Sequence, residues 1–217
     1  MFPITIVDNF LEDPDAIVRL SEQMEFKATT DGKWPGARTD QLWEHNHRLF
    51  NSIGIKIHSL FYEGIVDNWS MTMHFQKISP FDGDKWNKKN RGWIHKDLSS
   101  FGGIIYLSKD PDADSGTSIY KCKNGYQHQY PDELQVKEDL YTGKSTLSQD
   151  EYDKVFDAVN DQFVETVTVE NVYNRLLLFG GQTYHGVKTF GTKPRLTLNF
   201  FGYGVKDDRR YSPLERF

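Results

Sequence analysis

The chain has 217 residues, a formal net charge of -5 and a single cysteine, Cys122. This length suffices for one domain with a sizeable core. The mixing of acids and bases along the chain leaves no basic stripe, which argues against a nucleic-acid partner. One cysteine excludes an intrachain disulfide and a cysteine-based zinc site.

The sequence also contains no apolar run that approaches the length of a membrane span. Its first residues, MFPITIVDNFLEDPD, place acids early and lack the basic-then-apolar layout of a signal peptide. We therefore expect no membrane partner and a cytoplasmic location, which suits a chain with one cysteine. The oligomeric state is not readable from the sequence.

The N-terminal part, residues 1–65, is predicted to be mainly helical after one short strand, Phe2–Val7. Asp13 and Pro14 have the residue types of a helix N-cap and a first helical position. The apolar spacing that follows predicts a helix to about Glu25.

A loop is expected over Trp34–Arg38, which contains a Pro-Gly pair. Asp40–Phe61 then predicts a second helix or a broken pair of helices, because its apolar residues return to one side at helical spacing. Gly54 is the position where we expect an interruption.

From Trp69 onward the apolar residues alternate or form short runs, which indicates strands. The insertion over residues 131–160 interrupts this β core of residues 69–203, and Ser148 and Glu151 have the spacing of a helix capping box there. The strand candidates are Trp69–Ile78, Gly92–Lys96, Gly103–Ser108, Thr117–Tyr120, Phe163–Val169, Arg175–Phe179, His185–Thr189 and Arg195–Tyr203.

Helices followed by many short strands predict a single domain over residues 1–217 that is mainly β with flanking helices. The pattern is typical of a jelly-roll-like barrel with helices packed on one sheet. Periodicity alone does not separate this barrel from a β-sandwich.

Three side chains in this β core have the chemistry of metal ligands. His95 and Asp97 lie two residues apart in a predicted strand, so their side chains share a face. His185, which follows a Gly-Gly turn, is the best candidate for a third ligand from another strand. Two histidines and one carboxylate with open positions are the ligand set of non-haem Fe(II) oxygenases.

Arg195 and Thr197 repeat the same spacing on the last predicted strand. An arginine inside a barrel is costly unless an anion pairs with it, and a guanidinium binds a carboxylate through two parallel hydrogen bonds. A dicarboxylate cosubstrate that chelates iron at one end and reaches Arg195 at the other would satisfy both sites. Thr197 could donate one further hydrogen bond.

The motifs His95-Lys96-Asp97, His185 and Arg195-Leu196-Thr197 together resemble the Fe(II)- and 2-oxoglutarate-dependent dioxygenase superfamily, nearest to its prolyl-4-hydroxylase-like branch. The resemblance covers about Trp69 to Tyr203 and implies a double-stranded β-helix. It also implies that His95, Asp97 and His185 bind Fe(II) and that Arg195 holds the distal carboxylate of 2-oxoglutarate. Tyr106 and Gln76 are further candidate contacts to this cosubstrate.

By this resemblance the protein is expected to be an enzyme that uses dioxygen to hydroxylate a substrate, with release of succinate and carbon dioxide. The metal ligands are the only catalytic residues implied. The insertion over residues 131–160 lies outside the common core and is a candidate for substrate selection or a lid. The substrate, a small molecule or a peptide, is not identified.

Two alternatives remain open at the level of sequence. One is a jelly-roll binding or structural protein without turnover, and the other is a cupin-type metal enzyme that does not use 2-oxoglutarate. A His-x-Asp motif occurs often by chance, and His185 alone would be a core or turn residue. An inward-facing Arg195 favours the oxygenase over both alternatives.

Overall fold

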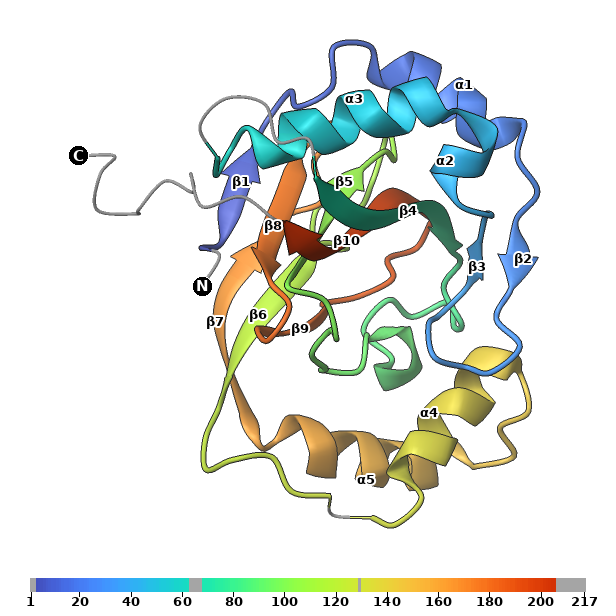
Figure 1. Ribbon diagram of the computed structural model, residues 1–217. Helices are drawn as coiled ribbons and strands as arrows, with labels where there is room; N and C mark the ends of the chain where they lie inside the picture. The colour runs from blue at the N-terminus through green and yellow to red at the C-terminus, as the bar shows by residue number, and fades with distance from the viewer. Residues whose placement is uncertain (1–2, 63–67, 129, 206–217) are drawn as a thin grey trace.

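In the computed structural model, which describes residues 3–62, 68–128 and 130–205, the strands form two antiparallel sheets (Figure 1). The larger sheet contains β1 (Thr5–Val7), β2 (Lys27–Ala28), β3 (Ala37–Arg38), β4 (Trp69–Ile78), β5 (Phe101–Tyr106), β8 (Leu176–Gly180) and β10 (Arg195–Val205), in the order β1-β8-β5-β10-β4-β3-β2. The smaller sheet contains β6 (Thr117–Cys122), β7 (Phe163–Val169) and β9 (Tyr184–Val187), in the order β7-β6-β9.

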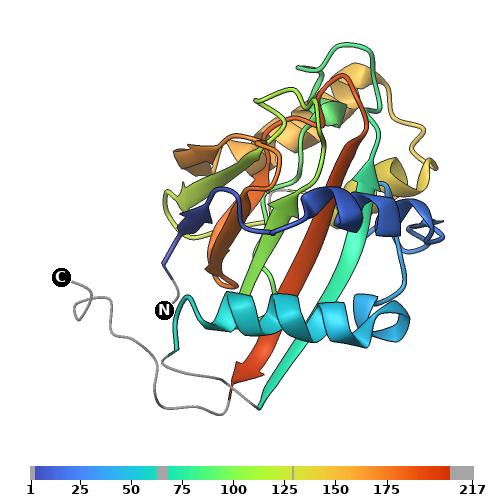
Figure 2. The same ribbon diagram turned by 90° about the horizontal axis from the view of Figure 1, so that it is seen from above.

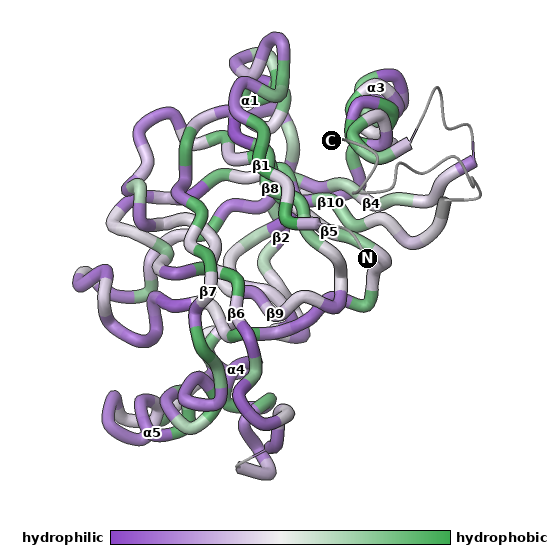
Figure 3. The backbone as a smooth tube through the Cα atoms, turned by 90° about the vertical axis from the view of Figure 1, so that its left-hand side faces the viewer, coloured by the Kyte–Doolittle hydropathy of each residue, from purple (hydrophilic) through white to green (hydrophobic). Residues whose placement is uncertain are grey.

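The helices lie at two ends of the molecule. Three of them precede the β core, α1 (Pro14–Glu22), α2 (Leu42–His45) and α3 (His47–His58), and Figure 2 shows α1 and α3 lying across the strands of the larger sheet. The helices α4 (Glu133–Thr142) and α5 (Gln149–Asn160) connect β6 to β7 at the opposite end (Figure 3). A short 3-10 helix, η1 (Lys88–Asn90), lies between β4 and β5.

The alternation of side chains along β10 explains why the larger sheet has two different faces. Leu198 and Phe200 are fully buried in the core between the sheet and the N-terminal helices. Arg195 and Asn199 point to the other face, where they line a cavity between the sheets. Because successive side chains of a strand point to opposite faces, one strand contributes both to the core and to the interior site.

Two further apolar clusters complete the packing. Residues of both sheets meet in the first, formed by Tyr106, Ile119, Val169, Leu177 and Phe179. The second attaches α4 and α5 to the smaller sheet, and its members are Trp93, Ile94, Val136, Leu140, Tyr152, Val155, Phe156, Val159 and Phe163. The insertion over residues 131–160 is therefore fixed to the barrel by its own core.

Most strand predictions are confirmed within a few residues, and Phe163–Val169 and Trp69–Ile78 are reproduced as predicted. The capping box is also confirmed, since Ser148 and Glu151 bond to each other's backbone N–H at the start of α5. Within the described residues, no helix is both long and apolar enough to span a bilayer.

Several helix boundaries were predicted incorrectly. The first helix ends at Glu22 rather than near Glu25, because the N–H of Gln23 turns back to Leu20 and closes the last turn. The broken pair of helices that was one of the two expectations for Asp40–Phe61 is confirmed, but the break lies not at Gly54 but at Asn46, whose side chain accepts a hydrogen bond from Leu49 N and caps α3. The helix runs through Gly54, since one glycine costs a packed helix only about 1 kcal/mol.

Two predictions in the β region were also wrong. Gly92–Lys96 forms no regular strand, because its backbone pairing with β9 consists of an isolated bridge between His95 and His185 and one hydrogen bond from Gly92 N to Val187 O, while Trp93 turns into the cluster with α5. The loop predicted over Trp34–Arg38 contains strand β3 at its end. Phe2, the predicted start of the first strand, lies outside the described residues, and the single domain over residues 1–217 stays a prediction.

Through its side chain, Asn174 hydrogen-bonds the N-terminal segment to the barrel. Its side chain accepts from Leu11 N and donates to Leu11 O, both at 2.8 Å, and it has a positive φ of 62° and an exposure of 5%. We expect Asn174→Ala to lower the free energy of unfolding by about 2–4 kcal/mol, because two buried backbone groups lose their partners. Denaturant unfolding measures this change.

Asn9 provides the matched control, because its φ of 54° is similar but the residue is exposed. Asn9→Ala carries the same backbone strain without the two buried hydrogen bonds. Equal destabilisation by both substitutions would assign the effect to backbone strain alone.

Candidate metal centre and anion-binding cavity

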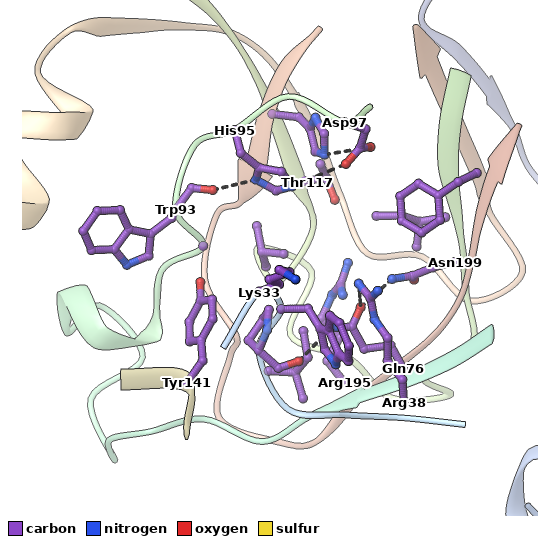
Figure 4. A pocket seen from close by; sticks show the side chains of 18 of the residues that line it. Lys33, Arg38, Gln76, Trp93, His95, Asp97, Thr117, Tyr141, Arg195 and Asn199 are labelled. Carbon is purple, nitrogen blue, oxygen red and sulfur yellow. Dashed lines mark hydrogen bonds and ion pairs between the residues drawn. The ribbon is translucent and has the colours of Figure 1, made fainter. Parts of the chain in front are cut away.

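A cavity of about 240 Å³ lies between the two sheets. Its wall combines residues of both sheets, the segment that leads into β3, and α4 (Figure 4). In Figure 4, His95 and Asp97 lie at one end of the cavity, and Arg195, Gln76 and Arg38 lie toward the other. The cavity therefore brings together side chains that are far apart in the sequence.

The backbone brings the three predicted metal ligands together. His95 N donates to His185 O at 3.0 Å, and His185 N donates to His95 O at 2.9 Å, which sets the two ring centroids 4.4 Å apart. Asp97 N donates to Gly181 O at 2.9 Å and anchors the carboxylate beside them. These backbone hydrogen bonds hold the three residues in place, so their side chains converge even though His95 and Asp97 lie outside a regular strand.

The distances within this triad suit a shared metal ion. His95 Nε2 lies 3.7 Å from Asp97 Oδ1, and His185 Nε2 lies 3.6 Å from Asp97 Oδ2. These separations are too long for hydrogen bonds, and Asp97 Oδ2 is buried without a hydrogen-bond partner. A Cβ on Gly102 would come 3.0 Å from this oxygen, so glycine leaves room for the carboxylate.

Hydrogen bonds fix both imidazoles in the state that a metal requires. Nδ1 of His95 donates to Trp93 O at 2.8 Å, and Nδ1 of His185 donates to Thr183 O at 3.0 Å. A carbonyl only accepts, so each ring carries its proton on Nδ1 and offers the lone pair of Nε2 to the triad.

The electrostatics agree with this assignment. Burial lowers the pKa of His185 to about 4, and desolvation together with the charge of His185 lowers the pKa of His95 to about 4. Both rings are therefore neutral at neutral pH, as metal ligation demands. Burial raises the pKa of Asp97, while the charges of His95 and Arg38 oppose this rise.

Within the described part of the chain, this triad is the one group of His, Cys, Asp or Glu side chains that could hold a metal ion. Two neutral imidazole nitrogens and one carboxylate fit the ligand preferences of Fe(II) and leave positions free for other ligands. Of the His95 side chain, 53% is accessible to solvent, so solvent reaches the candidate metal centre from the side of His95.

Arg195 is a buried cation without an anionic partner among the described residues. The residue is 3% exposed, its Nε donates to Ser115 O at 2.9 Å, and its Nη2 has no hydrogen-bond partner. Burial lowers the pKa of Arg195, and Tyr106, whose ring centroid lies 5.3 Å from the guanidinium carbon, opposes this shift. A lining residue with an unused charged donor is suited to bind a carboxylate.

The other predicted cosubstrate contacts lie at different depths. Gln76 lines the cavity, where its Oε1 accepts from Asn199. Tyr106 and Thr197 are fully buried behind the wall, where Tyr106 donates to Thr117 at 2.9 Å and Thr197 donates to Asn199 at 2.7 Å. The roles of these three residues toward 2-oxoglutarate stay predictions.

Several lining residues were not singled out from the sequence. Asn199 could have been, because it continues the alternation of Arg195 and Thr197 along β10. Arg38, from β3, and Lys137, from α4, give no such signal, since their positions depend on how remote segments pack over the barrel.

We expect Asp97→Ala and His185→Ala each to lower the affinity for divalent metal at least 100-fold, because each removes one of three ligands. Calorimetric titration of the metal-free protein with Fe(II) or Zn(II) measures this. Thermal unfolding of the metal-free variants should remain cooperative. His45→Ala is the control, since His45 is exposed on α2. Retained metal affinity in both triad variants, or loss of the fold in both, would refute the assignment.

Solved structures with this architecture are similar in fold and distant in sequence. An oxidoreductase of the 2OG-Fe(II) oxygenase family from Burkholderia pseudomallei aligns with a TM-score of 0.56 at 10% identity, covering 94% of this chain and 88% of that one. A prolyl hydroxylase from Trichoplax adhaerens, in complex with a hypoxia-inducible-factor peptide fragment, aligns with a TM-score of 0.51 at 12% identity, covering 92% and 83%. HygX from Streptomyces hygroscopicus with iron bound aligns with a TM-score of 0.50 at 12% identity, covering 96% and 84%.

These alignments confirm the predicted fold, a double-stranded β-helix that this chain shares with solved 2OG-Fe(II) oxygenases. No curated protein matches the sequence. Residues 2–201 match a protein family described as "Family of unknown function (DUF6445)". With nearly its whole length matched, the chain belongs to this DUF6445 family, here with an oxygenase fold that carries a His95, Asp97 and His185 triad.

Proposed function

We propose that the protein is an Fe(II)- and 2-oxoglutarate-dependent dioxygenase that hydroxylates its substrate and releases succinate and carbon dioxide. One observation carries the proposal: a two-histidine, one-carboxylate triad and a buried arginine without an anionic partner line the same cavity. A metal enzyme that does not use a dicarboxylate would leave Arg195 as an uncompensated buried charge.

In this proposal, His95, Asp97 and His185 hold Fe(II) through Nε2, one carboxylate oxygen and Nε2. The chemistry that Fe(II) supplies when bound is the coupling of 2-oxoglutarate decarboxylation and dioxygen reduction to oxidation of the substrate. The backbone carbonyls of Trp93 and Thr183 keep both imidazoles oriented toward the ion.

Arg195 binds the distal carboxylate of 2-oxoglutarate in the interior of the barrel. Its Nε is held by Ser115 O, which leaves Nη2 free for the carboxylate. Tyr106 supports the guanidinium with its ring, and its hydroxyl is fixed by Thr117. Gln76 is proposed to contribute a polar contact at the same end of the cavity, and Thr197, from behind the wall, is proposed to act through Asn199, to which it donates a hydrogen bond.

The remaining walls shape the substrate site. The insertion over residues 131–160 supplies Lys137 and Tyr141 to the lining, which supports its proposed role in substrate selection. The volume of about 240 Å³ suits small groups, such as a small molecule or one side chain of a peptide beside the cosubstrate.

We expect the protein to develop a visible charge-transfer band when Fe(II) and 2-oxoglutarate are added without oxygen, and to form succinate in air. Anaerobic absorption spectroscopy and succinate quantification measure the two effects. Asp97→Ala should abolish both. A wild-type protein that shows neither signal would favour a jelly-roll binding protein without turnover.

Arg195→Ala should weaken 2-oxoglutarate binding by about two orders of magnitude, because leaving one member of a buried charge pair unpaired costs roughly 2–5 kcal/mol. Fe(II) affinity should change little, since Arg195 is not a ligand. Titration of the anaerobic Fe(II) protein with 2-oxoglutarate separates the two. Arg175→Ala is the control, because Arg175 immediately precedes β8 of the same sheet and pairs with Asp8 at 2.6 Å. Equal loss of iron and cosubstrate would remove Arg195 from this role.

A further inference from the structure

The charges that line the cavity are strongly unequal. Among the described residues of the wall, one is a carboxylate, Asp97, whereas four are cations. The cations are Lys33, Arg38, Lys137 and Arg195. Arg195 is buried, and Arg38 and Lys137 are partly buried, so this excess of positive charge favours anions that enter the cavity from outside.

Lys33 does not contribute to this excess, because its Nζ lies 2.8 Å from Asp31 Oδ2 and forms an exposed ion pair. Arg195 is assigned to 2-oxoglutarate in the proposed function. Arg38 and Lys137 therefore remain to be explained, and neither forms a hydrogen-bonded ion pair with a described carboxylate.

Arg38 has the geometry of a prepared anion receptor. Its guanidinium carbon lies 4.6 Å from the ring centroid of Trp34 and 5.9 Å from that of Phe201, so aromatic rings hold the group in place. One nitrogen donates to Gln76 Oε1 at 3.3 Å, while Nε is buried without a partner. A stacked, planar guanidinium with a free donor suits a carboxylate or phosphate.

Lys137 adds a second cation from α4. Burial lowers its pKa, and the charges of Glu138 and Asp31 oppose that shift, although neither of these carboxylates lines the cavity. Burial also lowers the pKa of Arg38, to about 10, so it stays protonated at neutral pH.

The charge balance of the loaded site leads to the inference. A divalent ion, Asp97, Arg195 and the two carboxylates of 2-oxoglutarate are together neutral, so Arg38 and Lys137 leave two positive charges in the cavity. We propose that the substrate is a small anion, with a carboxylate or phosphate group that Arg38 and Lys137 bind while its oxidised carbon faces the metal. This inference rests on the proposed function, which supplies the assignment of Arg195.

The test measures binding rather than turnover. The protein is loaded with Zn(II) and with N-oxalylglycine, an unreactive analogue of 2-oxoglutarate, so that the Arg195 site is filled. Ligand-observed NMR then compares charged probes with neutral partners of nearly the same shape. N-acetyl amino acids are paired with their C-terminal amides, and glycerol 3-phosphate is paired with glycerol, which separates carboxylate from phosphate as the recognised group.

We expect at least one anionic probe to bind about tenfold or more tightly than its neutral partner. Arg38→Gln and Lys137→Gln should each reduce this preference about tenfold and leave N-oxalylglycine affinity unchanged. Lys33→Gln is the matched control, because Lys33 lines the same cavity but its charge is balanced by Asp31. It should retain the preference.

Three results would overturn the inference: no probe preferred over its neutral partner, a preference that survives both substitutions, or an Arg38→Gln variant that loses N-oxalylglycine affinity. The last result would assign Arg38 to the cosubstrate. Failure of wild-type protein to bind N-oxalylglycine would instead refute the proposed function. In that case the probe pairs are compared on the Zn(II) protein without N-oxalylglycine, so that failure of the inference and failure of the proposed function remain distinguishable.

Discussion

The exchange of backbone hydrogen bonds between His95 and His185 is the contact on which the interior site depends. It joins the irregular segment before β5 to β9 of the smaller sheet, at 3.0 and 2.9 Å, and it sets the two imidazoles beside each other. Asp97, held by Gly181 O, completes the group two residues later. Since backbone amides rather than side chains define these positions, the backbone itself orients the three candidate ligands, and binding of an ion would require little reordering.

The second constraint is that β10, the strand between β4 and β5, contributes side chains both to the core and to the cavity. One face carries Leu198 and Phe200 into the core beneath the N-terminal helices, while the other carries Arg195 and Asn199 into the cavity. A shift of register by one residue would exchange these faces, placing a guanidinium in an apolar core. The burial of the apolar face therefore fixes the position of Arg195 in the cavity.

The strand pattern and the helical insertion could be predicted from the sequence because they follow from local periodicity, whereas the triad was predicted from the His-x-Asp spacing, the Gly-Gly turn before His185 and the resemblance to a known family. The error at Gly92–Lys96 has a physical cause: two bridging hydrogen bonds suffice to hold His95, so the segment needs no regular strand. Arg38 and Lys137 could not be predicted as cavity residues, because they reach the wall from elements that are distant in the chain. The periodicity of a single element contains no information about such packing.

The loop that precedes β3 and the helix α4 are far from each other in the sequence but meet at the end of the molecule opposite α1 and α3 (Figure 1). A Cβ at Gly32 would come 2.4 Å from Glu138 Cα, so the two backbones touch directly where Gly32 adopts a φ of 70°. Together they close one side of the cavity, which Trp34 and Lys137 line. Neither segment contributes a ligand to the triad. Exchange of these two segments would therefore change the shape and charge of the cavity while the triad of His95, Asp97 and His185 stayed intact.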